Sequence, residues 1–199
     1  MPVILRYQVK NLPMIKHITS ALMLSSFVLV ASAQEAPNTK VTEPLTTISR
    51  LDVPRYMGDW HEIARTENWF QKDCQGAARA TYTLQPDGKV RVVNQCRLAS
   101  GEMKEAVGQA RQIGSATSAK LEVRFAPAWL SFLPFVWGDY WVIDLDNDYQ
   151  LVAVSEPSRK YLWILSRTPT VDLAAYEELL GRLKQKGFEP QQLRPTQKN

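Results

Sequence analysis

Residues 56–65 read Tyr-Met-Gly-Asp-Trp-His-Glu-Ile-Ala-Arg, and this stretch is the strongest guide to the fold. Gly58 lets the chain turn tightly, because glycine has no Cβ and tolerates backbone angles that other residues avoid. Trp60 follows and is large enough to fill the closed end of a hollow sheet. Because side chains alternate along a strand, His61 is expected on the face opposite to Trp60. The stretch predicts a first strand over residues 58–66.

Short β segments dominate the chain after this strand. They alternate apolar and polar residues and are rich in β-branched and aromatic side chains. Tight-turn sequences such as Pro86-Asp87-Gly88 separate them. Short strands joined by close turns are typical of a sandwich or a barrel, not of a parallel α/β sheet. The segments that we predict as strands two to eight are 78–84, 89–95, 103–113, 120–126, 140–145, 149–155 and 160–167.

One helix is expected after the last strand. Thr170 is its expected N-cap, and Gly187 can end it. The helix carries an apolar stripe at helical spacing: Leu173, Tyr176, Leu180 and Leu183. This stripe predicts that the helix packs on the outside of the sheet.

The first 33 residues have the features of a cleaved secretory signal. They hold three Lys or Arg residues and no acidic residue, and they end in Ala31-Ser32-Ala33, a small-x-small cleavage pattern. A membrane anchor is the alternative, but the apolar run is short for the roughly 30 Å of hydrocarbon in a bilayer. Translation starts at Met1 or at Met14, and the sequence leaves both open. We therefore predict a signal over 1–33, a flexible lead-in over 34–49, a folded domain over 50–199, and export.

Composition places the exported part among ordinary globular domains. Apolar residues make up 45% and charged residues 22% of the chain, which argues against disorder. The formal net charge of +4 falls to about +1 without the signal, and no basic run is interleaved with aromatics, so no nucleic-acid partner is predicted. The exported part has one histidine, His61, and no phosphate-binding loop. Neither a metal site nor a cofactor is expected.

Two cysteines, Cys74 and Cys96, follow the signal. An even number in an oxidising compartment favours a disulfide, and two free thiols are the alternative. In a simple hairpin register the two residues are not opposite each other. A bridge would then need the loop after the first strand to fold back, because the Cα atoms must come within about 7 Å.

Three positions resemble the signatures of the lipocalin family. Gly58 and Trp60 stand where the family has Gly-x-Trp, and Asp146 is the one residue retained from its Thr-Asp-Tyr turn between strands six and seven. Arg167 ends the last strand, where the family has an arginine that covers the tryptophan, a contact worth about 0.5–2 kcal/mol. The resemblance covers residues 51–188. It implies an all-β fold: an eight-stranded up-and-down antiparallel barrel with one C-terminal α-helix packed outside.

Three segments narrow the resemblance to the bacterial outer-membrane lipocalins, a subgroup close to apolipoprotein D; they are residues 60–65, 140–146 and 156–170. This subgroup implies a protein that binds, stores or transports a fatty acid or lysophospholipid for envelope maintenance under stress and catalyses no reaction. Many members carry a lipid anchor on an N-terminal cysteine. No cysteine stands at or next to the cleavage pattern here, so the expected location is the periplasm or the surface of the outer membrane without a lipobox anchor.

The resemblance also implies where a ligand would bind. Tyr161 and Trp163 share the face of Arg167 on the last strand, and we expect that face to point into the barrel. Trp137 enters the sixth strand from the open end, and Tyr140 is a further candidate. Glu62 shares the face of Trp60 and either holds a head group or pairs with a basic neighbour. For each aromatic residue, plain packing in the core is the alternative to ligand contact.

The segment from Trp129 to Trp137 is unusually apolar for a loop at the open end of a barrel. Three explanations remain open. The segment folds inward and lines the cavity, or it dips into a membrane surface, where tryptophan is favoured. In the third explanation it forms a homodimer contact.

Two further function classes compete with lipid binding. A cavity enzyme with isomerase-like chemistry would need a nucleophile, and a free Cys74 is the natural candidate. A barrel that binds or inhibits another protein would use the apolar open end. Haem or another tetrapyrrole is an alternative ligand for the cavity.

Overall fold

The structure is a computed structural model, and it describes residues 43–196 of the 199-residue chain. The predicted signal and most of the predicted lead-in lie outside the described residues. Leu45 and Leu51, at the start of the described chain, are buried, with 5% and 1% of their surface exposed. The folded part therefore begins before Gly58.

Eight strands form an antiparallel barrel, as predicted. Each strand from β2 to β7 pairs with the strand that follows it in the sequence. Strand β1 pairs with both β8 and β2, and this closes the ring. The strands are β1 Gly58–Arg65, β2 Cys74–Leu84, β3 Val90–Leu98, β4 Met103–Gln112, β5 Lys120–Arg124, β6 Gly138–Leu145, β7 Leu151–Ser155 and β8 Leu162–Ser166. The remaining elements are α1 Val53–Tyr56, η1 Trp69–Gln71, η2 Ala128–Leu130, η3 Pro134–Val136, α2 Leu173–Gln185, η4 Pro190–Gln192 and β9 Arg194–Pro195.

The seam between β1 and β2 closes the barrel over only part of its height. Residues 58–61 of β1 pair with residues 79–82 of β2. Further along β1, Ala64 and Arg65 pair instead with the two residues of β9. The C-terminal segment thus takes the place of β2 beside the last residues of β1, those that precede loop 66–73.

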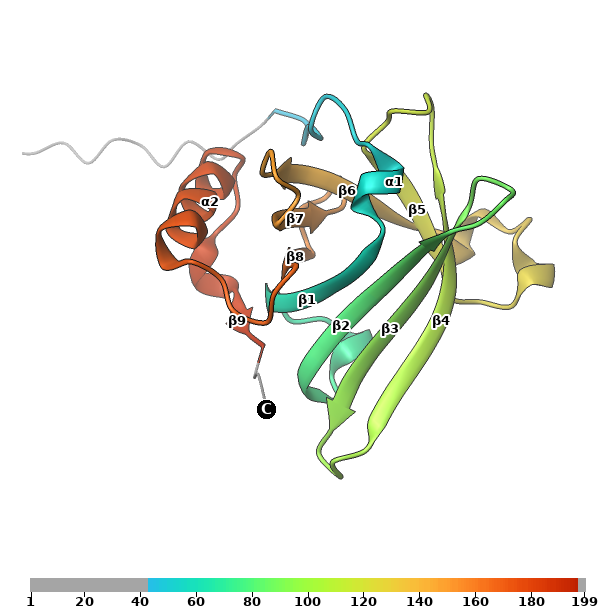
Figure 1. Cartoon of the computed structure of the whole chain (residues 1–199), viewed down its shortest axis with the longest axis horizontal. Helices are drawn as coiled ribbons and strands as arrows, with labels where there is room; N and C mark the ends of the chain where they lie inside the picture. Colours follow the sequence, from blue (N-terminus) through green and yellow to red (C-terminus); the bar gives the residue numbers. More distant parts are fainter. Residues whose placement is uncertain (1–42, 197–199) are drawn as a thin grey trace, which may run out of the picture. The chain divides into compact units, whose positions relative to one another are not determined.

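The two ends of the barrel differ in what covers them. Helix α1 directly precedes β1 and lies at the same end as the turns 85–89, 113–119 and 146–150, which we call the closed end (Figure 1). The loops 66–73, 99–102, 125–137 and 156–161 lie at the other end, which we call the mouth. This division follows from the up-and-down order of the strands, because successive connections alternate between the ends.

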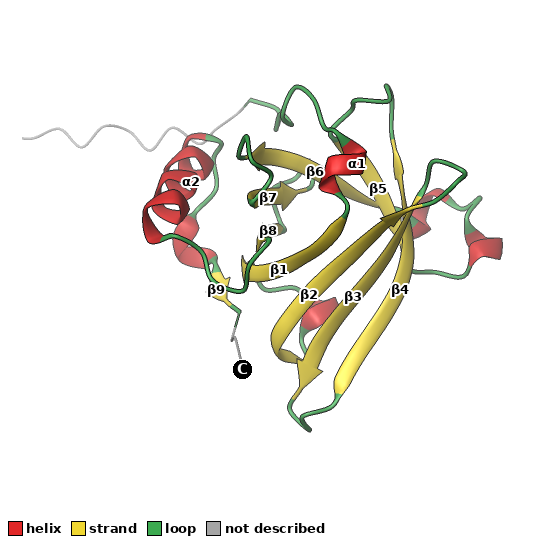
Figure 2. Cartoon of the chain, viewed as in Figure 1, coloured by secondary structure: helices red, strands yellow, loops and turns green. Residues whose placement is uncertain are grey.

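Apolar side chains form two cores, one on each face of the barrel wall. The inner core surrounds Trp60, and the outer core lies between the wall and α2, which stands outside the barrel next to β7 and β8 (Figure 2). All five residues of β7 are buried, because this strand faces the inner core on one side and α2 on the other. This explains why β7 lacks the polar alternation of a strand with one solvated face.

Helix α2 packs as predicted, but its start and its buried stripe differ from the prediction. The N-cap is Asp172, whose carboxylate accepts a hydrogen bond from the Ala175 N–H at 3.0 Å, and not Thr170. Leu173 therefore falls in the first turn, where it is 70% exposed. Leu179, which the prediction left out, is buried with Leu183 in the outer core.

None of the helices in residues 43–196 has the length and apolar character needed to cross a bilayer.

Candidate functional site

The barrel encloses a cavity of about 770 Å³. Small residues on the inward faces of β2 and β4 keep this space open, because their side chains reach only a short way toward the axis. Ala78, Ala80, Ala106 and Ala110 all line it. Most other wall residues are apolar: Val90, Val92, Leu121, Val123 and Leu165. An apolar cavity with a few polar groups is typical of a small-molecule site, and an eight-stranded barrel has room for one such ligand.

Trp60 and Arg167 form the closed end beneath the cavity. The Trp60 side chain is fully buried, and its indole N–H donates a hydrogen bond to the Tyr56 carbonyl at 2.9 Å. The Arg167 guanidinium lies 4.0 Å from the centre of the indole ring. Gly58 has a φ of +94°, and a Cβ there would lie 3.3 Å from an Arg167 nitrogen. Glycine is needed here both for the backbone angle and for the approach of the guanidinium.

Three tyrosines from separate elements meet above this floor. The Tyr140 hydroxyl lies 2.8 Å from the hydroxyl of Tyr56 and 3.1 Å from that of Tyr82. The rings of Tyr56 and Tyr82 are stacked, with centres 5.8 Å apart. Burial raises the pKa of Tyr82 to about 12 and the pKa of Tyr56 and Tyr140 well above the ordinary value. All three hydroxyls are therefore neutral hydrogen-bonding groups at physiological pH.

An aromatic cluster forms one wall of the mouth. Phe70, from the loop after β1, lies 5.6 Å from the ring of Tyr161 and 6.1 Å from that of Trp163. The Trp163 indole N–H donates to the Gln71 side-chain oxygen at 2.9 Å. Tyr161, Trp163 and Tyr140, which we singled out from the sequence, all line the cavity. The structure thus brings all three to one cavity.

Glu62 also lines the cavity, but its carboxylate is engaged by neighbouring side chains. One oxygen accepts hydrogen bonds from Arg65 and Thr196, each at 2.5 Å, and the other accepts from Gln71 at 2.8 Å. Glu62 is 8% exposed, and a buried acid of this kind is stabilised by its partners. Of the two roles that the sequence allowed, the geometry favours pairing over holding a head group. The network joins β1 to the C-terminal segment at the open part of the seam.

Trp137 lines the entrance of the cavity, but its ring packs on charged groups. The Arg111 guanidinium lies 4.1 Å and the Arg124 guanidinium 5.2 Å from a Trp137 ring centre. Its indole N–H donates to the Ser131 carbonyl at 2.8 Å. Trp137 therefore holds the loop after β5 against the strands.

Three aromatic side chains of that loop do not line the cavity. Trp129 and Phe132 are each 73% exposed and Phe135 is 81% exposed. Of the three explanations, the inward fold is therefore wrong for these three side chains. The reason is that residues 128–136 form two short 3₁₀ turns that extend the loop beyond the strands. A membrane surface and a second copy of the chain remain as partners for them.

The predicted disulfide between Cys74 and Cys96 is confirmed, with Cα atoms 5.5 Å apart. The expected route to it was wrong, because Cys74 belongs to strand β2 and is paired in the sheet. Strand β2 begins at Cys74 rather than at residue 78, and two register shifts between Cys74 and Arg79 bring the cysteines together. Ala77, with a φ of +47°, lies within the irregular part. With both sulfurs bonded to each other, the thiol chemistry that a free Cys74 would offer is not available.

Sequence reasoning missed several residues that line the cavity, among them Tyr56, Tyr82 and Lys104. Tyr82 follows Ala78 and Ala80 at even spacing, so the alternation of β2 could have placed it inside. The Lys104 ammonium lies at the mouth, 3.4 Å from an Asp73 carboxylate oxygen. Tyr56 lies in α1, where strand alternation gives no signal.

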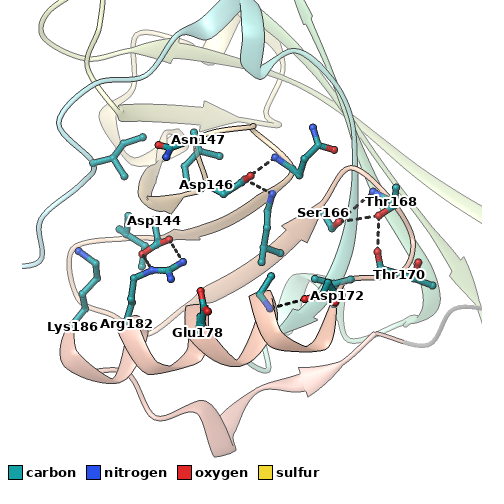
Figure 3. A pocket seen from close by; sticks show the side chains of 17 residues that line it. Asp144, Asp146, Asn147, Ser166, Thr168, Thr170, Asp172, Glu178, Arg182 and Lys186 are labelled. Atoms are coloured by element: carbon teal, nitrogen blue, oxygen red, sulfur yellow. Dashed lines mark hydrogen bonds and ion pairs between the residues drawn. The ribbon is translucent and has the colours of Figure 1, made fainter.

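A second cavity of about 590 Å³ lies outside the barrel, between α2 and the β6–β7 turn (Figure 3). Its three aspartates already serve the fold. Asp144 pairs with Arg182 at 2.9 and 3.0 Å, and Asp172 caps α2. Asp146 accepts hydrogen bonds from backbone N–H groups of its own turn, including that of Leu151 at 2.6 Å. The cavity inside the barrel is therefore the better candidate for a ligand.

Among residues 43–196 no three His, Cys, Asp or Glu side chains are grouped to hold a metal ion.

Comparisons with known proteins agree with this architecture. Residues 51–198 match the family model described as a lipocalin-like domain. The chain is 39% identical over 154 residues to temperature-induced lipocalin-1 of Arabidopsis thaliana, covering 76% of this chain and 82% of the relative. It is 36% identical over 183 residues to the outer membrane lipoprotein Blc of Citrobacter freundii, covering 92% and 94%. Apolipoprotein D of Macaca fascicularis is 33% identical over 143 residues, covering 69% and 71%.

Solved structures support the fold at much lower sequence identity. Insecticyanin of the tobacco hornworm Manduca sexta matches with a TM-score of 0.60 at 17% identity, covering 78% of this chain and 85% of the other. A cockroach allergen, Per a 4, matches with a TM-score of 0.56 at 22% identity, covering 75% and 89%. The barrel, its plugged floor and these matches together show that the chain belongs to the lipocalin family, whose members are mostly binding proteins without enzymatic activity.

Proposed function

We propose that this lipocalin takes up a fatty acid or lysophospholipid, holds its acyl chain inside the barrel, and carries it without chemical change. The apolar cavity of about 770 Å³ carries the proposal. Its alanine-lined wall accepts an apolar chain, and its aromatic mouth is amphipathic. Lys104 at the entrance is a cation that suits a carboxylate or phosphate head group.

The relatives suggest where this binding would serve. One of those reported above, from Citrobacter freundii, is named an outer membrane lipoprotein. We propose that the chain is exported to the periplasm or to the surface of an outer membrane and serves envelope maintenance under stress. Fractionation of cells that make the full chain would test the location, and a protein retained in the cytoplasm would contradict it.

Titration calorimetry with dodecanoate and with lysophosphatidylethanolamine, both below their micelle concentrations, tests the binding. We expect saturation at one ligand per chain. Ala106→Trp would place an indole inside the cavity, because Ala106 lines it, and it should weaken binding. Val107→Trp is the matched control, because Val107 is the next residue, lies outside the cavity lining and is 49% exposed. Binding that survives Ala106→Trp unchanged would place the ligand elsewhere.

The exposed loop after β5 suggests how a lipid would reach the cavity. We propose that Trp129, Phe132 and Phe135 rest on a lipid surface, since aromatic side chains favour the membrane interface. Replacing all three by serine should abolish sedimentation with vesicles of phosphatidylethanolamine and phosphatidylglycerol. Binding of dodecanoate from solution should persist in that variant. Ultracentrifugation that shows a dimer lost in the same variant would favour the second-copy explanation instead.

A further inference from the structure

The three tyrosines near the floor have more donors than their own contacts use. Each of the hydroxyls of Tyr56, Tyr82 and Tyr140 carries one proton, and two contacts join them, at 2.8 and 3.1 Å. Two protons satisfy these two contacts, whichever atom donates. Within the described residues the hydroxyls have no other hydrogen-bond partner. One O–H therefore remains to be donated toward the cavity, which all three residues line.

The surroundings make this unused donor an unusual feature of the cavity. Tyr56 and Tyr82 are 2% and 7% exposed and belong to the inner core with Trp60 and Leu121. A polar group in such a place is costly unless it finds a partner, so an acceptor that reaches it is stabilised. High pKa values keep the three hydroxyls protonated, and so they remain donors.

We infer that the tyrosine triad of Tyr56, Tyr82 and Tyr140 binds a neutral oxygen atom at the inner end of the ligand. The ligand class is then a single-chain amphiphile that carries an oxo, ester or ether oxygen at the end that enters first. Its charged head group stays at the mouth near Lys104. This inference deepens the proposed function and rests on it.

The triad suits a neutral oxygen better than an ionised one. A buried carboxylate or phosphate needs a cation or several donors to offset the loss of water. The triad offers one unused proton. A ketone or ester carbonyl needs only one good donor, whereas a plain methyl end would leave that donor without an acceptor.

A matched pair of probes tests the inference: dodecanoate, and 11-oxododecanoate, which adds a ketone near the far end of the same chain. In the wild-type protein we expect the keto acid to bind between about twofold and tenfold more tightly, the worth of one neutral hydrogen bond. We also expect the infrared band of the bound ketone to shift to lower frequency, because its carbonyl accepts a hydrogen bond. This second readout needs no variant.

The triple variant Y56F/Y82F/Y140F removes the donors together and nearly preserves shape, so it leaves no partner unsatisfied. The preference for the keto acid and the band shift should both disappear in this variant. Y176F is the matched control, because Tyr176 packs against the outer core and not the cavity. Should the wild-type protein bind both probes equally with an unshifted ketone band, the inference fails and the proposed function stands. Should dodecanoate itself not bind, the proposed function fails.

Discussion

Arg167 joins three separate backbone segments at the closed end of the barrel. Its guanidinium group donates to the carbonyls of Asp59 at 2.9 Å, Arg55 at 3.0 Å and Tyr149 at 3.2 Å. The same group covers Trp60, so one side chain fixes α1, β1 and the β6–β7 turn against the floor. A planar group with donors in several directions can do this, and a lysine ammonium cannot.

Replacing Arg167 by alanine should lower the free energy of unfolding by about 2–4 kcal/mol, because three charged hydrogen bonds and a cation–π contact are lost. Arg167→Lys should recover less than half of that loss. Urea unfolding followed by tryptophan fluorescence measures both. Arg91→Ala, at an exposed position of β3, is the control and should change stability by less than about 0.5 kcal/mol. An equal effect of the two alanine variants would contradict the bridging role of Arg167.

Tyr82 makes the stability fall at high pH. Burial raises its pKa from 10.0 to about 12, so the unfolded chain loses this proton at lower pH than the folded protein does. The stabilisation is complete below pH 10 and is lost as the pH rises toward 12. Over that interval Tyr82 should remove about 2–3 kcal/mol of the free energy of unfolding. Urea unfolding at several pH values should show a shallower decline in Y82F, and identical slopes would contradict the prediction.

At the scale of elements, α2 shows how capping chemistry sets the beginning of a helix. The Asp172 carboxylate accepts from the Ala175 N–H at 3.0 Å, which satisfies one of the free donors of the first turn. The side chain of Thr170 makes no such contact with the helix. Leu179 and Leu183, in later turns of the helix, are buried in the outer core.

Asp172→Ala should therefore destabilise the protein by about 0.5–2 kcal/mol, the usual cost of losing an N-cap. Thr170→Ala should be close to neutral. Thermal unfolding of the two variants compares them directly. A larger loss in Thr170→Ala would mean that the helix begins at Thr170, as the sequence alone indicated.

For the molecule as a whole, the disulfide fixes the mouth rather than the floor. Cys74 and Cys96 join β2 to β3 across 22 residues and line the cavity. Reduction should lower the free energy of unfolding by about 3 kcal/mol, because the unfolded chain regains loop entropy. It should also speed ligand release, because the strands at the mouth lose a covalent tie. Unfolding and stopped-flow release of bound dodecanoate, with and without reductant, measure the two effects, and Cys74→Ser/Cys96→Ser should behave like the reduced protein.

Local pattern was sufficient for much of this architecture. Strand alternation and turn residues predicted short strands in a sandwich or a barrel, and the resemblance carried by Gly58, Trp60 and Arg167 implied the eight-stranded barrel with its outer helix. Alternation also predicted which face of β8 points inward. These features depend on neighbours in the chain, where side-chain periodicity carries the information. The same reasoning placed Tyr161, Trp163 and Tyr140 on the cavity wall.

Only the tertiary structure decided which of these residues meet and which loop residues stay outside. The tyrosine triad joins α1, β2 and β6, and the Glu62 network joins β1 to a residue near the C-terminus, so neither can be read from a local pattern. The disulfide required a bulge in β2 that shifts the pairing register. The physical reason is common to these cases: hydrogen bonds and cross-strand contacts depend on distances set by closure of the barrel, which the order of residues along one strand does not contain.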